Sequence, residues 1–322
     1  MSKRKKTVLI FDINTFPKLF LSKIKKLNNL KIKVIKNEDK SKLFKEAHNI
    51  NALINCPRSY FDEKLFKKFK KLEWVHTAGA GVESFLIPSF VKSNIIFTNG
   101  KILQGPEVAD HAVGLLLSLT RNIKAHILKK KVLHIRRPIE LFKKKALVIG
   151  FGGIGSNICE RLVGFGMKID IISEDLPPMN NYINNFFELD KLYNIVKNYD
   201  VIISAAPLTK KTYKIFNKVF FNNMKKQGIF INVSRGKLVD TTALLNKKII
   251  EKLWGIGLDV TDPEPLSADH SLRKKENVII TDHTAGLSDF NRLRAYDLIL
   301  TNIKRYSKKE KLFNIVDKIN GY

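Results

Sequence analysis

The segment Leu147-Val-Ile-Gly150-Phe-Gly152-Gly-Ile-Gly155 is the strongest indication of the fold in this chain, because an apolar run leads directly into a Gly-x-Gly-x-x-Gly pattern. Apolar residues at helical spacing follow, at Ile154, Ile158 and Leu162. In a turn between a buried strand and a helix, the first glycine allows a tight bend and the second lets a pyrophosphate approach the backbone. The third lets the helix pack against the strand, and the helix N-terminus offers free N–H groups.

A glycine pattern alone recurs by chance, and an ordinary strand-to-helix turn is the alternative interpretation. The flanking strand and helix favour a dinucleotide-binding turn instead. We therefore expect the phosphates of a dinucleotide to be bound by Gly150, Gly152, Gly153, Ile154 and Gly155.

The composition is that of a globular enzyme. The chain has 322 residues, of which 44% are hydrophobic and 27% are charged. Its longest apolar runs, Ala112 to Leu119 and Ala146 to Phe151, are too short to span a bilayer. The basic first residues are followed by an apolar run that ends at Asp12, which is not typical of a signal peptide. Two cysteines are too few for a disulfide framework or a metal site, so we expect a cytoplasmic protein without a metal.

A net charge of +28 raises the alternative of a nucleic-acid-binding protein. The excess is mostly lysine, however, and it is spread from end to end in short runs such as Lys67-Lys68 and Lys308-Lys309. No basic helix and no interleaving of basic with aromatic residues is present in the sequence. We interpret the charge as solvated surface that attracts small anions, and we expect no specific nucleic-acid or membrane partner.

The first part of the chain alternates short strand-like runs with amphipathic helical ones. Such alternation predicts a parallel sheet covered on both faces. The expected strands are Val8–Phe11, Ile32–Ile35, Ala52–Ile54, Trp74–Thr77 and Ile95–Thr98. The expected helices lie near Leu19–Leu27, Lys42–Ala47, Glu63–Phe69 and Val82–Phe90, followed by one long helix from about Glu107 to Leu128 and a basic linker over 129–143.

The alternation restarts at Ala146 and predicts a second doubly wound α/β domain. Six strands are expected, which is the number in a Rossmann fold. They lie at 146–149, 168–172, 200–203, 229–232, 255–259 and 278–281. A final helix, Arg292 to Tyr306, is expected to pack back onto the first domain.

Further motifs occur in a fixed order along nearly the whole chain. They are Thr77-Ala-Gly-Ala-Gly-Val-Glu83, Glu107-Val-Ala-Asp-His111, Ala206-Pro-Leu-Thr209, Asn232-Val-Ser-Arg-Gly236, Leu258-Asp-Val-Thr-Asp-Pro-Glu-Pro-Leu266 and Thr281-Asp-His-Thr-Ala-Gly286. Together with the glycine turn they resemble the D-isomer-specific 2-hydroxyacid dehydrogenases, and most of all the glyoxylate/hydroxypyruvate reductase-like branch. The resemblance implies a Rossmann NAD-binding domain over 102–286, inserted in a flavodoxin-like substrate domain formed by 1–101 and 287–322.

Three side chains suit the reduction of a 2-oxo acid. His283 follows the last strand, and histidine can supply a proton near neutral pH. Glu264 follows the neighbouring strand and would orient the imidazole and favour its protonated form. Arg235 follows the strand before that, and its planar guanidinium matches a carboxylate and can polarise a carbonyl group. The resemblance implies these same roles for Arg235, Glu264 and His283.

Further roles are implied by the resemblance. The backbone of Ala78, Gly79 and Ala80 would hold the substrate carboxylate, together with Arg235. Asp259 would face the nicotinamide carboxamide, and the cofactor cleft would be lined by Pro207, Val233, Ser234, Arg235 and His283. We expect His111, in the long helix, to have a packing role only.

The sequence departs from the family pattern at three places. The residue before the catalytic histidine is usually Pro and is Asp282 here, and a usual Ser-Pro-Leu-Trp segment reads His270-Ser-Leu-Arg273. Where an acidic residue would bind the adenosine ribose stands Ser173, followed by Glu174 and Asp175. These carboxylates would repel a 2′-phosphate, so we expect NAD as the cofactor, with NADP as the alternative.

The function predicted is therefore the NAD(P)-dependent reduction of a small 2-oxo acid, such as glyoxylate or hydroxypyruvate, to the D-2-hydroxy acid. The alternatives are a catalytically idle NAD-sensing corepressor or scaffold on the same fold, and a phosphoglycerate dehydrogenase or a phosphonate or formate specialist. The long apolar helix after Glu107 predicts a homodimer.

Overall fold

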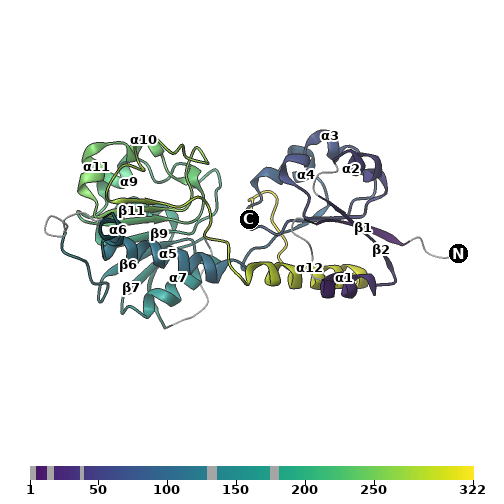
Figure 1. Cartoon of the computed structure of the whole chain (residues 1–322), viewed down its shortest axis with the longest axis horizontal. Helices are drawn as coiled ribbons and strands as arrows, with labels where there is room; N and C mark the ends of the chain where they lie inside the picture. Colours follow the sequence, from purple (N-terminus) through teal and green to yellow (C-terminus); the bar gives the residue numbers. More distant parts are fainter. Residues whose placement is uncertain (1–4, 13–17, 37–39, 129–135, 175–180) are drawn as a thin grey trace. The chain divides into compact units, whose positions relative to one another are not determined.

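The computed structural model describes residues 5–12, 18–36, 40–128, 136–174 and 181–322. The chain forms two compact units, which are described separately below. Unit 1 comprises Met1–Leu103 and Asp289–Tyr322, and unit 2 comprises Gln104–Ser288. Both units are α/β structures in which helices surround a central parallel sheet (Figure 1).

Unit 1 is built on a five-stranded sheet of order β2-β1-β3-β4-β5, in which all pairs are parallel. This is the strand order of flavodoxin-like folds. The strands are β1 Lys6–Asp12, β2 Leu30–Lys36, β3 Ala52–Ile54, β4 Trp74–His76 and β5 Ile96–Thr98. The helices are α1 Lys18–Lys25, α2 Lys40–Glu46, α3 Glu63–Phe66, α4 Pro88–Val91 and α12 Asn291–Lys308.

The two faces of this sheet are covered by different helices. On one face α1 and α12 pack on Val8, Ile10 and Trp74, so the last helix does return to the first unit as the sequence predicts. On the other face α2, α3 and α4 enclose a core rich in phenylalanine, with ring contacts among Phe61, Phe85, Phe90 and Phe97.

Unit 2 is built on a seven-stranded parallel sheet of order β12-β11-β10-β9-β6-β7-β8. Counted from β6, this is the Rossmann order 3-2-1-4-5-6 with a further strand at the end. The strands are β6 Lys145–Ile149, β7 Lys168–Ile172, β8 Ile183–Phe187, β9 Val201–Ser204, β10 Ile229–Asn232, β11 Gly255–Leu258 and β12 Val278–Ile280.

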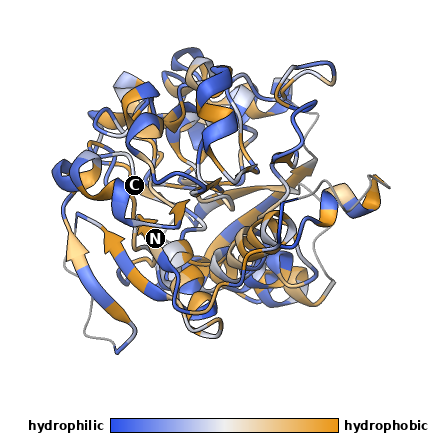
Figure 2. Cartoon of the chain, turned by 90° about the vertical axis from the view of Figure 1, so that its left-hand side faces the viewer, coloured by the Kyte–Doolittle hydropathy of each residue, from blue (hydrophilic) through white to orange (hydrophobic). Residues whose placement is uncertain are grey.

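Helices cover both faces of this second sheet, which therefore has two apolar cores. They are α5 Gly105–Thr120, α6 Ile123–Ile127, α7 Gly153–Val163, α8 Leu192–Ile195, α9 Lys218–Asn223, α10 Thr241–Leu244 and α11 Lys247–Lys252. The buried apolar residues of these two cores come from the strands and from the helices that cover them, and Figure 2 shows hydrophobic and hydrophilic residues interspersed along the helices. The expected fold class, two doubly wound parallel-sheet domains of which one is a Rossmann fold, is confirmed.

Three details of the sequence prediction were wrong. The Rossmann sheet contains one strand that was not predicted, β8, because this edge strand is half exposed and contains Asn184 and Asn185. The long helix ends at Thr120, because Asn122 has a left-handed backbone (φ 57°), and α6 follows as a separate helix. The helix expected over Val82–Phe90 is a 3-10 turn followed by the short α4, since a proline restricts the residue before it to extended backbone.

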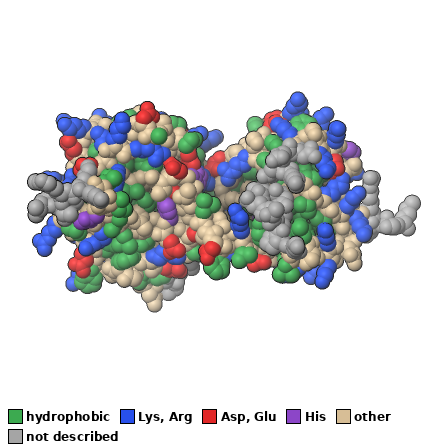
Figure 3. All heavy atoms as spheres, in the orientation of Figure 1, with side chains coloured by type: hydrophobic (Ala, Val, Ile, Leu, Met, Phe, Trp, Pro, Cys, Tyr) green, Lys and Arg blue, Asp and Glu red, His purple; other side chains and the backbone are tan. Residues whose placement is uncertain are grey.

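In the described part of the chain no helix is long and apolar enough to cross a membrane. The lysine and arginine side chains are scattered over the visible faces of both units rather than gathered in one patch (Figure 3).

One titratable side chain is sealed inside unit 1. His76, on β4, has no exposed surface, and its Nδ1 lies 2.8 Å from the hydroxyl of Thr98. The same hydroxyl accepts a hydrogen bond from Nε1 of Trp74. Burial lowers the pKa of His76 to about 3, so the ring stays neutral in the folded unit.

We predict that His76 makes unit 1 sensitive to acid. The unfolded chain takes up a proton near pH 6.5 and the folded unit does not, so the stability from this group is complete above that pH. It is lost as the pH falls towards 3, by at most about 1.4 kcal/mol per pH unit. The test is hydrogen exchange of the β4 amides between about pH 7.5 and about pH 4.5. As the pH falls, the amides should lose protection more steeply in the wild type than in His76→Gln.

His48 is exposed in the same unit, so His48→Gln is the matched control and should behave as the wild type. Equal pH dependence of β4 protection in the wild type and in His76→Gln would contradict the prediction.

Candidate active site

The candidate residues of unit 2 all follow strands, at the carboxyl edge of one parallel sheet. Gly150 follows β6, Ser173 follows β7 and Pro207 follows β9 closely. The Val233–Arg235 segment follows β10, Asp259 and Glu264 follow β11, and His283 follows β12. Because the strands are parallel and in register, these segments meet along one edge, where open α/β sheets bind their ligands.

The glycine turn has the close packing that its sequence pattern predicts. Gly150 has a positive φ of 94°, and its N–H donates to the carbonyl of Ile172 at 2.7 Å. A Cβ atom on Gly155 would lie 1.9 Å from the carbonyl oxygen of Gly150, so only glycine lets α7 approach the turn this closely. The loop and the helix therefore meet without an intervening side chain.

The start of α7 fits a phosphate group. Gly152 is the N-cap residue of this 11-residue helix, is exposed, and provides no side-chain cap to the first N–H groups. A Cβ atom placed on Gly152 would meet no atom within 4 Å, so the space over the turn is open to a ligand. Free N–H groups at a helix N-terminus favour an anion, which agrees with a pyrophosphate at this position.

The residues at the end of β7 are polar, and one of them takes part in an ion pair. Ser173 is half-buried, and the exposed Glu174 forms an ion pair with Lys211, with 3.3 Å between Oε1 and Nζ. Asp175, the second acidic residue noted in the sequence, lies outside the described residues.

The Val233–Arg235 segment is shaped by a buried asparagine at the end of β10. The side-chain oxygen of Asn232 accepts hydrogen bonds from the backbone N–H and the hydroxyl of Ser234, at 3.1 and 2.7 Å. Its Nδ2 donates to the carbonyl of Arg235 at 2.9 Å. Arg235 is therefore held at the sheet edge by its backbone, with its guanidinium donating to the carbonyl of Ser234.

Gly236, next to Arg235, lies against the segment that follows β11. A Cβ atom on Gly236 would lie 1.8 Å from the carbonyl oxygen of Thr261. This contact brings the arginine-bearing segment against the one that carries Glu264. Pro207, on the neighbouring β9 side, is exposed, and its carbonyl accepts a hydrogen bond from the hydroxyl of Thr212 at 2.7 Å.

Glu264 and His283 are hydrogen-bonded to each other, through Oε1 of Glu264 and Nδ1 of His283. Both side chains remain accessible, with 38% and 50% of their surface exposed. His283 has a left-handed backbone (φ 53°), and its N–H donates to the carbonyl of Asp259 at 2.8 Å. With Nδ1 directed at the carboxylate, Nε2 of the imidazole is left to meet a ligand.

Asp259 is almost completely buried beneath this pair. Its Oδ1 accepts from the hydroxyl of Thr281 at 2.6 Å and from the N–H of Thr284 at 3.0 Å, and its Oδ2 accepts from the N–H of Ala285 at 3.1 Å. His111, on α5, contacts the same group, with Nε2 lying 2.8 Å from the hydroxyl of Thr281 and 3.3 Å from Oδ1 of Asp259.

Sequence reasoning predicts only packing for His111 and misses these polar contacts. The link joins a helix residue to strands more than a hundred residues later in the chain. The sequence offers one indication: at helical spacing His111 lies on the same side of α5 as the buried residues Val108 and Leu115, so it faces the sheet.

The loop Ala78–Ala80 belongs to unit 1 and follows β4. Its carbonyl groups are engaged, since Gly79 accepts from the N–H of Gly100 at 3.1 Å and Ala80 accepts from Nδ2 of Asn99 at 2.7 Å. The guanidinium of Arg58 donates to the carbonyl of Gly81 at 3.4 Å, and sequence reasoning missed this cation beside the loop. Among the described residues, no group of three or more His, Cys, Asp or Glu side chains could hold a metal ion.

A Rossmann sheet with an open glycine turn at its carboxyl edge is typical of the nucleotide-dependent dehydrogenases. The family model described as D-isomer specific 2-hydroxyacid dehydrogenase, NAD binding domain, matches residues 113–285. This match spans more than half of the chain. The chain therefore belongs to the D-isomer-specific 2-hydroxyacid dehydrogenase family, whose members are NAD-dependent oxidoreductases.

Individual relatives agree with this assignment. The chain is 30% identical over 259 residues to an uncharacterised protein in the proB 3′ region of Corynebacterium melassecola, covering 79% of this chain and 84% of that protein. It is 29% identical over 282 residues to the glyoxylate reductase of Pyrococcus horikoshii, covering 83% of each. A solved glyoxylate reductase from Paecilomyes thermophila has the same fold, with a TM-score of 0.84 at 18% identity, covering 98% of this chain and 99% of that one.

The contact between Gly155 and Gly150 yields a stability prediction. In Gly155→Ala the added methyl group meets backbone, which cannot move aside as a side chain can, so unit 2 should lose about 3 kcal/mol or more of stability. Urea unfolding followed by tryptophan fluorescence measures the loss.

Gly114 in α5 is the control, because it is exposed and a Cβ atom there would meet no atom within 4 Å. Gly114→Ala should leave stability unchanged or raise it by up to about 1 kcal/mol, since alanine favours a helix. A Gly155→Ala protein as stable as the wild type would show that the close approach of α7 to the turn is wrong.

Proposed function

We propose that the protein reduces a small 2-oxo acid, of the glyoxylate or hydroxypyruvate type, to the corresponding 2-hydroxy acid, which is the D-isomer wherever C2 of the product is a stereocentre. The observation that carries the proposal is the Glu264–His283 hydrogen bond, which lies at the carboxyl edge of the sheet that also carries the glycine turn. The likeness to the Pyrococcus glyoxylate reductase supports the choice of substrate class.

The glycine turn is the proposed site for the cofactor phosphates. Gly150, Gly152, Gly153, Ile154 and Gly155 would contact the pyrophosphate through backbone N–H groups at the start of α7. Further contacts would come from the residues that follow the other strands, namely Ser173, Glu174, Pro207, Val233, Ser234, Arg235, Asp259 and His283. The bound reduced nicotinamide supplies the hydride for C2 of the substrate.

His283 is the proposed acid. Its Nδ1–H faces the carboxylate of Glu264, so the proton for the carbonyl oxygen of the substrate is held at Nε2. Glu264 fixes the orientation of the imidazole ring through this hydrogen bond. In the oxidative direction the same Nε2, without its proton, would accept the hydroxyl proton.

Arg235 and the Ala78–Ala80 loop are the proposed carboxylate binders. The guanidinium of Arg235 offers two parallel N–H groups, which suit a carboxylate and can also polarise the neighbouring carbonyl. In the loop, the backbone N–H groups would bind the anion, while the carbonyl groups of Gly79 and Ala80 accept hydrogen bonds inside unit 1.

NAD is the proposed cofactor form, because the carboxylate of Glu174 lies where a 2′-phosphate would be repelled. NADP is the alternative, since Lys211 partly neutralises that carboxylate. The Glu264–His283 pair argues against a catalytically idle scaffold, which would need no group for proton transfer. The homodimer, the cytoplasmic location and the assignment of unit 1 as substrate domain stay predictions.

We predict that the protein oxidises NADH when given glyoxylate, hydroxypyruvate or a 2-oxo acid of similar size, measured by the absorbance of the reduced nicotinamide. His283→Ala should lower kcat by about 10²–10⁴-fold, which is the usual contribution of a positioned acid. NADH binding, measured by fluorescence titration, should change little.

His48→Ala removes an exposed histidine of unit 1 and is the control for loss of imidazole. The proposal would be overturned if no 2-oxo acid supported oxidation of NADH or NADPH, or if His283→Ala kept wild-type turnover.

A further inference from the structure

Two residues that depart from the family pattern, Arg273 and Asp282, are in contact with each other. Nη2 of Arg273 lies 2.7 Å from Oδ1 of Asp282. Asp282 immediately precedes His283, so this ion pair attaches to the segment that carries the proposed acid. The arginine side chain is 25% exposed and the aspartate 69%, which places the pair at the surface end of the site.

The same guanidinium also holds the segment that carries Glu264. Its Nη2 donates to the carbonyl of Leu266 at 3.0 Å, and its Nε donates to the carbonyl of Ser267 at 3.2 Å. These carbonyls lie two and three residues after Glu264. The side chain of Arg273 therefore connects the segment that carries Glu264 with the segment that carries His283.

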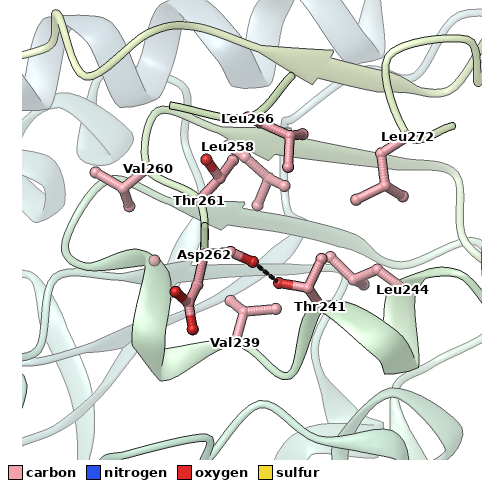
Figure 4. A pocket seen from close by; sticks show the side chains of 10 residues that line it. Val239, Thr241, Leu244, Leu258, Val260, Thr261, Asp262, Leu266 and Leu272 are labelled. Carbon is pink, nitrogen blue, oxygen red and sulfur yellow. Dashed lines mark hydrogen bonds between the residues drawn. The ribbon is translucent and has the colours of Figure 1, made fainter. Parts of the chain in front are cut away.

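The backbone on either side of this contact is held in place by buried leucine side chains. Leu266 and Leu272 are 4% and 1% exposed, and together with Leu258 they line a small cavity behind the segment (Figure 4). On its other side the cavity is closed by Thr241, whose hydroxyl donates to the carbonyl of Asp262 at 2.6 Å. Because Leu272 is packed inside, the position of Arg273 next to it is set by the core.

The charges around His283 explain why a cation is needed there. Glu264 bonds the imidazole, and Asp282 adds a second carboxylate one residue away. Asp259 and His111 face the same segment from the buried side, where the carboxylate of Asp259 is already engaged by three donors. Arg273 is the cation that pairs with Asp282, so Glu264 is left as the carboxylate that acts on the ring.

We propose that Arg273 is a positioning residue for the reaction: it holds the Glu264 and His283 segments in register and neutralises Asp282. This role rests on the proposed function, since it concerns the same histidine. Arg273 acts through Asp282 and the two carbonyls.

The test compares Arg273→Met, Asp282→Asn and the double variant with the wild type. The first readout is the NMR titration of the His283 imidazole, identified by its absence in His283→Gln, which needs no substrate. The second is kcat and KM for 2-oxo acid reduction. Arg273→Lys is included as the conservative variant, and it keeps the test usable if Arg273→Met fails to fold.

The matched control is Arg161→Met. Arg161 forms an ion pair with Asp110 in the same unit, at 2.6 Å and with 26% and 70% exposure, so its geometry nearly equals that of Arg273 and Asp282. It joins α7 to α5 and makes no contact with the His283 segment in the described structure. Its loss should leave the titration of His283 unmoved.

Opposite shifts are expected for the two single variants. In Arg273→Met the unpaired Asp282 favours the charged imidazole, so the titration midpoint of His283 rises; in Asp282→Asn the unpaired guanidinium lowers it. The double variant returns close to the wild-type midpoint. Arg273→Met should lower kcat about tenfold or more with KM for NADH unchanged, because small displacements of a catalytic group are costly. Arg273→Lys should recover part of that loss.

The double variant should be no slower than the slower single variant, since both substitutions remove one contact. Additive losses of kcat, or a His283 midpoint in Arg273→Met equal to that of Arg161→Met, would overturn the proposal. A wild type that turns over no 2-oxo acid, while the midpoints still shift as stated, would refute the proposed function and leave the role of Arg273 in holding the two segments standing.

Discussion

The carboxylate of Asp259 is buried at the end of β11 and accepts hydrogen bonds from Thr281, Thr284 and Ala285, all in the segment that follows β12. Its backbone carbonyl accepts a fourth, from the N–H of His283. A buried charge is tolerated only when its oxygens are well satisfied, so this segment has few other conformations available. The left-handed backbone of His283 and the direction of its ring towards Glu264 follow from that constraint.

Around this centre, the parallel sheet determines which chemistry is possible. Because the strands are parallel and in register, the glycine turn, Arg235, Glu264 and His283 lie at a single edge of the sheet, although these residues are far apart in the sequence. The close approaches at Gly155 and Gly236 then remove the space that side chains would occupy between neighbouring segments. The start of α7 and the Glu264–His283 pair therefore lie on the same unit, in agreement with the proposed reduction of a 2-oxo acid by a nicotinamide.

Local patterns in the sequence predicted much of this arrangement. The strand before Gly150 and the strand-end positions of Glu264 and His283 follow from apolar runs and turn residues, which act over a few neighbours. Contacts across the chain could not be predicted in this way. Arg273 and Asp282 read as two separate departures from the family pattern, and only the fold brings them within 2.7 Å of each other. The polar edge strand β8 and the break at Asn122 have weak local signals for the same reason: tertiary contacts decide them.

In the proposed reaction, reduced nicotinamide bound at this edge transfers its hydride directly to C2 of a 2-oxo acid, and the product is the D-isomer. The test uses hydroxypyruvate, whose reduction product has a stereocentre at C2, and NADH carrying two deuterium atoms at C4 of the nicotinamide. The product is analysed by mass spectrometry and chiral chromatography. We expect deuterium at C2 of the D-2-hydroxy acid alone. A product without deuterium, or an L or racemic product, would contradict the proposed reaction.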